Sequence, residues 1–279
     1  MVASASFAAA NIGYVICVAV ASRAGEGEAT LYAYAYFAAA LLVSTTAVSA
    51  AMVRAPQILA GAQAAGEAAR STVSTYRFTV ILIAPVLALA LLAGRPVLGF
   101  LLGADFEGED AQRLVITLVC LTGWVLGSAA GIYAVVHLLA NGRASALAAI
   151  AVVQTVVLVG LAIAGNELAG IEGIAIAQSL SLLGGTVAQL RLAFPREWRQ
   201  LLVRLGAATA GGAAVIVAAA VPGLVLYEAA GRDTVPTLVA VALCSGVALL
   251  ATRVAFPYEL RSMAAMARAR GRGYDQGLS

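Results

Sequence analysis

The sequence contains eight long runs of apolar residues, and short segments between them hold almost all of its charged side chains. The hydrocarbon core of a bilayer is about 30 Å thick and is crossed by roughly 20 apolar residues of helix. Only 11% of the residues are charged, against roughly 25% in soluble domains. This is too few charged side chains to cover a surface that faces water. We therefore predict an all-α, polytopic helical membrane protein with about eight transmembrane helices. The runs lie at residues 3–22, 31–53, 78–94, 114–138, 145–165, 170–190, 203–225 and 236–256.

The charged residues divide unevenly between the segments that connect these runs. All 17 basic residues are Arg; thirteen of them lie in one alternating set of segments and the C-terminal tail, and four lie in the other set. Ten of the 14 acidic residues lie in that second set. Because segments rich in Arg stay in the cytoplasm, we predict that both termini are cytoplasmic. The predicted location is the cell membrane (plasma or inner), crossed several times.

The sequence contains no motif typical of an enzyme or of a metal site. It has no HExxH, no GxSxG and no Gly-rich phosphate-binding loop with Lys, and its single His excludes a multi-His metal site. Cys17, Cys120 and Cys244 each lie in an apolar run without neighbouring metal ligands, which favours packing roles over a disulfide framework. We therefore predict that the protein is not an enzyme, holds no cofactor or metal, and binds no nucleic acid.

A few polar side chains interrupt the expected membrane helices. Such side chains line hydrated cavities, or they form hydrogen bonds between helices that are worth about 0.6 to 2 kcal/mol. Both interpretations stay open for each of them. The candidate cavity-lining residues, which would bind substrate, are Asn11, Tyr14, Tyr36, Tyr133, Gln154 and Gln178.

Arginines and one tryptophan mark the expected cytoplasmic boundary of the membrane. Arg54 ends the second run and Arg143 precedes the fifth, so both are candidates for a basic mouth that attracts an anionic headgroup. The alternative is that long basic side chains near helix ends anchor the helices by reaching to the interface. Trp198, between Arg196 and Arg199, marks an interfacial stretch before the seventh run.

Small residues in the fourth run predict close helix packing. Gly123, Gly127 and Gly131 recur every four residues and expose a strip of backbone that another helix can approach. In the third run Pro85 frees a backbone carbonyl, and we expect a kink there.

A series of short motifs follows in order through about residues 1–193. They are Gly25, Gly27, Leu31–Tyr36, Pro56, Ala84-Pro85, Arg95–Leu98, Leu101–Gly103, Gly142-Arg143 and Gly170–Ala175. By the spacing of these motifs, more than by any one of them, the chain resembles the C-terminal part of the multidrug/oligosaccharidyl-lipid/polysaccharide exporter superfamily, in particular its polysaccharide and lipid II flippase branches.

The resemblance implies a domain organisation. Residues 1–193 would form a six-helix bundle like the C-terminal lobe of these transporters, 194–256 two accessory transmembrane helices, and 257–279 a basic cytoplasmic tail. The first run has no basic residue before it. We therefore expect that the natural beginning of the chain, with the first lobe, has been lost.

The resemblance also implies a function. The chain would belong to a flippase or exporter of a polyprenyl-linked oligosaccharide or cell-wall polysaccharide precursor that works by alternating access. Its expected partners are the lipid-linked saccharide, membrane lipids, and a missing N-terminal lobe or a homodimer mate. Lipid II flippases resemble one another in an Arg where this chain has Tyr36, so the implied substrate is kept at the broader class. The alternatives are a small-molecule or drug exporter of the same superfamily and a non-transporting membrane scaffold subunit.

Overall fold

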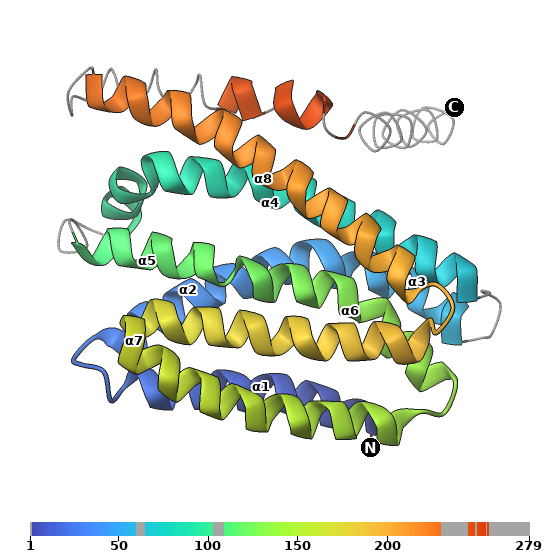
Figure 1. Ribbon diagram of the computed structural model, residues 1–279. Coiled ribbons are helices and arrows are strands. Elements are labelled where there is room, and N and C mark those ends of the chain that lie inside the picture. The colour runs from blue at the N-terminus through green and yellow to red at the C-terminus, as the bar shows by residue number, and fades with distance from the viewer. Residues whose placement is uncertain are drawn as a thin grey trace, which may run out of the picture. The chain divides into compact units, whose positions relative to one another are not determined.

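The computed structural model describes residues 2–59, 65–102, 109–229, 245–248, 250–254 and 256. These residues form helices joined by short turns and include no strand, which confirms the predicted all-α class. The helices, shown in Figure 1, are α1 (Val2–Ala21), α2 (Glu28–Val43), the π-helical segment η1 (Ser44–Val48), α3 (Ser49–Leu59), α4 (Ala65–Leu102), α5 (Glu109–Cys120), α6 (Thr122–Ala140), α7 (Ala144–Ala193) and α8 (Trp198–Ala229).

Five helical stretches in the described part of the chain are long and apolar enough to cross a membrane. The segments Ile12–Ala21 and Ser245–Val254 are apolar but shorter. The described helices therefore fit a multi-pass membrane protein, whereas the eight crossings and the cytoplasmic termini stay predictions. The five stretches are Glu28–Val53, Gly66–Leu91, Glu109–Ala140, Ala144–Ala193 and Trp198–Val221.

Helix α7 is a hairpin of two arms, residues 144–168 and 171–193 (Figure 1). The helical backbone breaks at Ala169 and at Gly170, whose φ of 59° is a conformation that glycine adopts at little cost. Near this tip Gly165 faces the backbone of Gly173 so closely that a Cβ on either would collide with the other's carbonyl. The arms run antiparallel and correspond to the fifth and sixth predicted runs.

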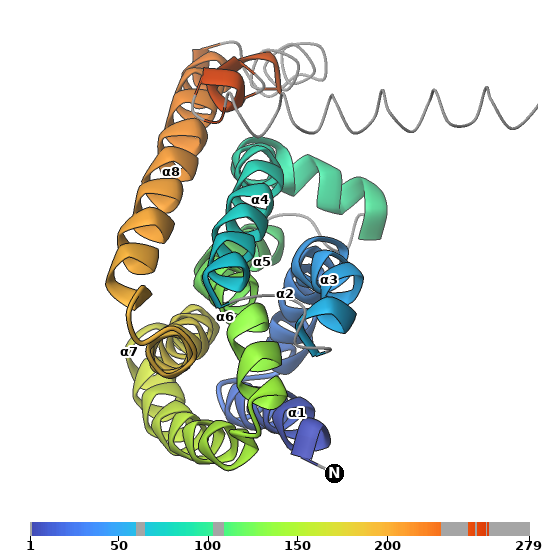
Figure 2. The same ribbon diagram turned by 90° about the vertical axis from the view of Figure 1, so that its right-hand side faces the viewer.

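The chain divides into two compact units, of which unit 1 comprises Met1–Thr79 and Ala93–Gly206. In unit 1, α1 packs on α2 and on the first arm of α7, where Gly13 meets Leu158. The second arm packs on α6, where Gly123 meets Ser179. Because α2 also packs on α5 and α6, these contacts close a ring of helices (Figure 2).

The glycine strip of α6 lies in the contact between α6 and the second arm of α7. A Cβ at Gly123 would lie 2.8 Å from Cβ of Ser179, and a Cβ at Gly127 would lie 3.3 Å from Leu182. The Thr186 hydroxyl donates to the Gly127 carbonyl at 3.1 Å across the same surface. The predicted close packing along this strip is confirmed.

The second predicted run forms α2, η1 and α3 in succession. At η1 the hydroxyls of Thr45 and Thr46 donate to carbonyls four residues earlier, and Ser49 donates to the carbonyl of Ser44, five residues earlier. Such bonds from Ser and Thr compete with the regular helix ladder, and Pro56 removes one further backbone donor in α3. A cluster of hydroxyl residues therefore widens the helix in the middle of an otherwise apolar segment.

Unit 2 comprises Val80–Leu92 and Ala207–Ser279. Its core contains Ala88, Ala219 and Ala248, one residue each from α4, α8 and the helical residues near 250. Gly212 of α8 lies directly against Val80 of α4. Helix α4 extends beyond the predicted run 78–94 at both ends. It stays helical through Pro85, and the kink expected at that residue remains a prediction.

Candidate functional site

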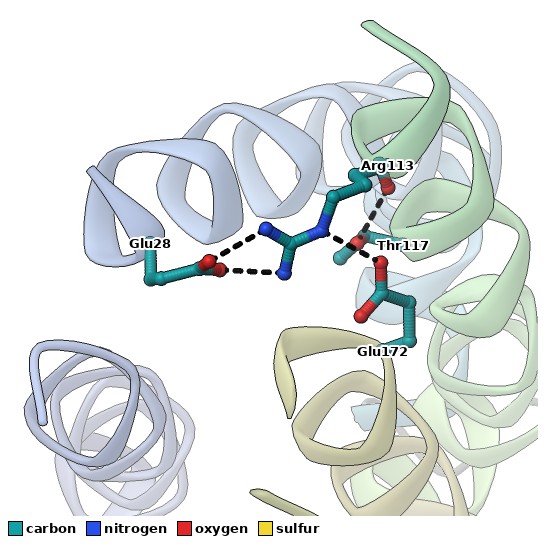
Figure 3. A network of polar contacts seen from close by, with 4 residues as sticks. All are labelled: Glu28, Arg113, Thr117 and Glu172. Carbon is teal, nitrogen blue, oxygen red and sulfur yellow. Dashed lines mark hydrogen bonds and ion pairs between the residues drawn. The ribbon is translucent and has the colours of Figure 1, made fainter. Parts of the chain in front are cut away.

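Three charged side chains from three helices of unit 1 meet in what we call the charged triad: Glu28, Arg113 and Glu172 (Figure 3). The guanidinium of Arg113 donates two parallel hydrogen bonds to the carboxylate of Glu28, from Nη1 to Oε1 at 2.6 Å and from Nη2 to Oε2 at 2.8 Å. Its Nε donates to Oε1 of Glu172 at 3.4 Å. A two-pronged Arg–carboxylate pair is among the stronger polar contacts in proteins.

Helix starts place the two carboxylates of the triad. Glu28 is the first residue of α2, after Gly27, whose φ is 82°. Glu172 is the second residue of the second arm of α7, two residues after Gly170. The N-terminal end of a helix favours negative charge, so both carboxylates suit these positions, and Arg113 in α5 neutralises one of the two charges.

A cluster of aromatic rings follows the triad along the same helices. Tyr32 and Tyr36 lie one and two turns after Glu28 on one face of α2. Tyr36 stacks on Tyr14 of α1 with ring centroids 4.6 Å apart, and it meets Trp124 of α6 at 4.9 Å. With Phe37, 5.8 Å from Tyr14, these residues form the aromatic cluster: Tyr14, Tyr32, Tyr36, Phe37 and Trp124.

Gln178 supplies an amide beside the aromatic cluster. The Tyr32 hydroxyl donates to Oε1 of Gln178, which belongs to the second arm of α7. Tyr32 has no exposed surface and Gln178 is buried, whereas Tyr14, Tyr36 and Trp124 are half-buried and Phe37 is exposed. The cluster therefore extends from the interior of the ring of helices to its surface.

The structure brings three of the predicted cavity residues together and places two elsewhere. Tyr14, Tyr36 and Gln178 all belong to the region just described. Tyr133 is fully buried between α3 and α4; it donates to the Ala50 carbonyl at 3.1 Å and accepts from Thr75 at 3.1 Å.

The remaining predicted residues lie outside this region or outside the described side chains. Gln154 is half-buried between the arms of α7, where its amide lies against Gly185. Arg143 is exposed and donates to the Leu192 carbonyl at 3.2 Å, at the end of α7 far from the triad along both arms. The side chains of Asn11 and Arg54 lie outside those that the structure describes.

Sequence reasoning missed the charged triad and Trp124. The triad residues lie at the ends of apolar runs and are separated by 85 and 59 positions. One signal was available: Arg113 is one of only four arginines in the set of segments that holds ten of the acidic residues. A basic residue such as Arg113, in segments that hold many carboxylates, is expected to form an ion pair with one of them.

Rings and one amide, next to an ion pair, suit recognition of a polar molecule that also has apolar faces. Aromatic faces with a few placed polar groups are typical of ligand sites, and a sugar ring offers both C–H faces and hydroxyls.

Among the described residues no group of three or more His, Cys, Asp or Glu could hold a metal ion. Comparison of the chain with known family models, curated proteins and solved structures gives no match in any of the three.

Proposed function

We propose that the chain forms the substrate-binding lobe of an exporter that flips a polyprenyl-linked oligosaccharide or a cell-wall polysaccharide precursor. The observation that carries the proposal is the aromatic cluster with Gln178 inside a ring of apolar helices. Stacked rings beside an amide offer the two kinds of contact that a saccharide needs. The resemblance to polysaccharide and lipid II flippases adds the mode of action, alternating access.

The membrane topology is part of this proposal. At 1.5 Å per residue each arm of α7 is about 35 Å long, so each can cross a hydrocarbon core of about 30 Å by itself. With the two arms counted separately, and with α1 and the helix near residue 250, the chain would cross eight times. Both termini would then be cytoplasmic, and the charged triad would lie at the outer boundary.

In this proposal the saccharide binds at Tyr36 and Trp124 while the polyprenyl tail stays in lipid. One lobe does not enclose a two-sided cavity, so a second lobe or a second copy of the chain completes the path. Carriers of this kind rock two bundles about a central site. Along the strip at Gly123 and Gly127 the side chains of Ser179 and Leu182 pack closely on α6, so α6 and the second arm of α7 are suited to move together as one rigid bundle.

Binding to the aromatic cluster can be measured with Trp124 alone. The chain has two tryptophans, so Trp198→Phe leaves Trp124 as the single reporter. A polyprenyl diphosphate oligosaccharide with a short prenyl chain is added to the protein in a detergent that has no sugar headgroup. We expect a saturable change in Trp124 emission, and about tenfold weaker binding in Tyr36→Ala, the loss that corresponds to about 1.4 kcal/mol.

The matched control is Tyr34→Ala, an exposed residue of the same helix, which should bind as the parent does. Equal responses to the oligosaccharide and to sugar-free polyprenyl diphosphate would contradict a saccharide site. A response to a hydrophobic cation in place of the saccharide would favour the drug-exporter alternative. No response to any of these ligands would leave the scaffold alternative. A polar side chain that is fully buried and hydrogen-bonded within the protein, as Tyr133 is, agrees with such a subunit.

A further inference from the structure

Five arginines surround the turn between α7 and α8, at the end of unit 1 away from the charged triad. All five side chains are exposed. We call this group the basic surface; it consists of Arg143, Arg191, Arg196, Arg199 and Arg204.

Trp198, the first residue of α8, lies between Arg191 and Arg199 of the basic surface, and its backbone is bound to the turn before it. Phe194 has no exposed surface and stacks on His137 of α6 with centroids 5.3 Å apart. The Trp198 N–H donates to the Phe194 carbonyl at 2.9 Å, which starts α8 at a fixed point. The guanidinium carbons of Arg191 and Arg199 lie 5.7 and 5.5 Å from the Trp198 ring centroid, within cation–π range.

The charge of the basic surface is not neutralised by the described part of the chain. None of the five arginines pairs with a carboxylate there, in contrast to Arg113, which pairs with two. Glu197 is the one acidic residue between Phe194 and Arg204. Its single charge leaves a strong positive excess on a small area.

Apolar side chains continue from the basic surface along the same helices. Val203 of α8, five residues after Trp198, is 73% exposed, and Leu192 of α7, six residues before Trp198, is 38% exposed. A soluble anion would satisfy the arginines and leave these side chains uncovered. A molecule with an anionic head and hydrocarbon chains would cover both.

We propose that the basic surface binds the phosphate headgroup of an anionic phospholipid, whose acyl chains lie along Leu192 and Val203. The planar fork of Arg matches two phosphate oxygens, and Trp prefers the level of the headgroups. Each Arg near an anionic leaflet contributes about 1 kcal/mol, which is about fivefold in affinity. The lipid would be a resident neighbour of the lobe and not its transported cargo, so this inference does not depend on the proposed function.

Trp198 reports on this lipid directly. In a Trp124→Phe background it is the single tryptophan. The full chain is reconstituted in phosphatidylcholine vesicles that contain increasing fractions of phosphatidylglycerol with dibrominated acyl chains, or of dibrominated phosphatidylcholine. We expect half-maximal quenching at a several-fold lower fraction of the brominated phosphatidylglycerol.

Variants then assign the selectivity to named arginines. Arg191→Gln with Arg199→Gln should lower the preference for the anionic lipid by about fivefold per residue, and Arg196→Gln with Arg204→Gln, which keeps the contacts to Trp198, should lower it as well. Arg23→Gln, an exposed arginine between α1 and α2, should leave the preference unchanged.

Two results would overturn the proposal. Equal quenching by both brominated lipids in the parent protein would mean that Trp198 is only an interfacial anchor. Loss of the preference on addition of inorganic phosphate at constant ionic strength would mean that the surface takes a free anion.

Discussion

At the scale of single residues, Arg113 is a side chain that links three helices of unit 1. It joins the start of α2 to the start of the second arm of α7, and its own carbonyl accepts from Thr117 at 2.8 Å within α5 (Figure 3). The Arg113 side chain is 27% exposed and that of Glu28 is 15% exposed. Pairs of this kind lie between the weak exposed ion pairs and the strongly coupled buried ones.

We predict that Glu28→Gln destabilises the protein by on the order of 1 to 2 kcal/mol, because it removes the two-pronged bond and leaves a partly buried Arg113 with one longer contact. The measurement is unfolding of the purified protein by a titration with sodium dodecyl sulfate. Glu26→Gln, an exposed carboxylate in the preceding loop, is the control and should have no effect. If the two variants unfold alike, the triad does not contribute to stability.

The contacts of single side chains were the part of the structure that the sequence predicted least well. Tyr14, Tyr36 and Gln178 stood out because each is polar within an apolar run, and the structure does bring them to one region. Tyr133 stood out for the same reason, yet its hydroxyl is hydrogen-bonded within the protein, to Ala50 of α3 and Thr75 of α4. Which polar residue faces which neighbour depends on the order of helices around the ring, and the one-dimensional pattern does not contain that order.

At the scale of helices, the hairpin of α7 depends on two glycines that let its arms touch. Gly165 and Gly173 meet backbone to backbone, so a methyl group on either has no flexible side chain to displace. Gly160 and Gly184, on the first and second arm respectively, face open space. The same residue type therefore has opposite roles along one hairpin.

We predict that Gly173→Ala destabilises the protein by at least about 1 to 3 kcal/mol, the usual cost of overpacking, because the arms must separate near the tip. Gly184→Ala should be neutral or should stabilise by up to about 1 kcal/mol, since Ala favours the helix. Both are measured as shifts in the same detergent titration. A Gly173→Ala protein as stable as Gly184→Ala would show that the arms do not approach closely.

Seven of the predicted runs correspond to helices of the described residues, because the length of an apolar run is a local property; most of the eighth run, 236–256, lies outside those residues. The fifth and sixth runs correspond to the two arms of α7, and the glycine strip of α6 packs as its spacing predicts. The π-helical segment η1 was not predicted, although Ser44, Thr45 and Thr46 form a cluster of hydroxyls in the sequence. Hydroxyls in a membrane helix bond to the backbone or to another helix, and the choice depends on what packs beside them.

At the scale of the whole molecule, unit 1 has two chemically different ends. The charged triad and the tip of α7 share one end, because Gly170 lies beside Arg113 and Glu172. The Gly142 turn and the basic surface share the other, because Arg143 bonds to Leu192 at the far end of the hairpin. The helices of unit 1 thus separate the charged triad from the arginines of the basic surface.

This polarity predicts the orientation of unit 1 in the membrane, because segments rich in Arg remain cytoplasmic. In a background with Cys17, Cys120 and Cys244 replaced by Ala, a cysteine is placed at Leu168, which is 87% exposed near the hairpin tip, or at the exposed Asn141 at the other end. A membrane-impermeant maleimide added to intact cells should label Leu168→Cys at once and Asn141→Cys only after permeabilisation. Labelling of both from outside would contradict two crossings by α7. The reverse pattern would place the basic surface on the outer face and would contradict the orientation.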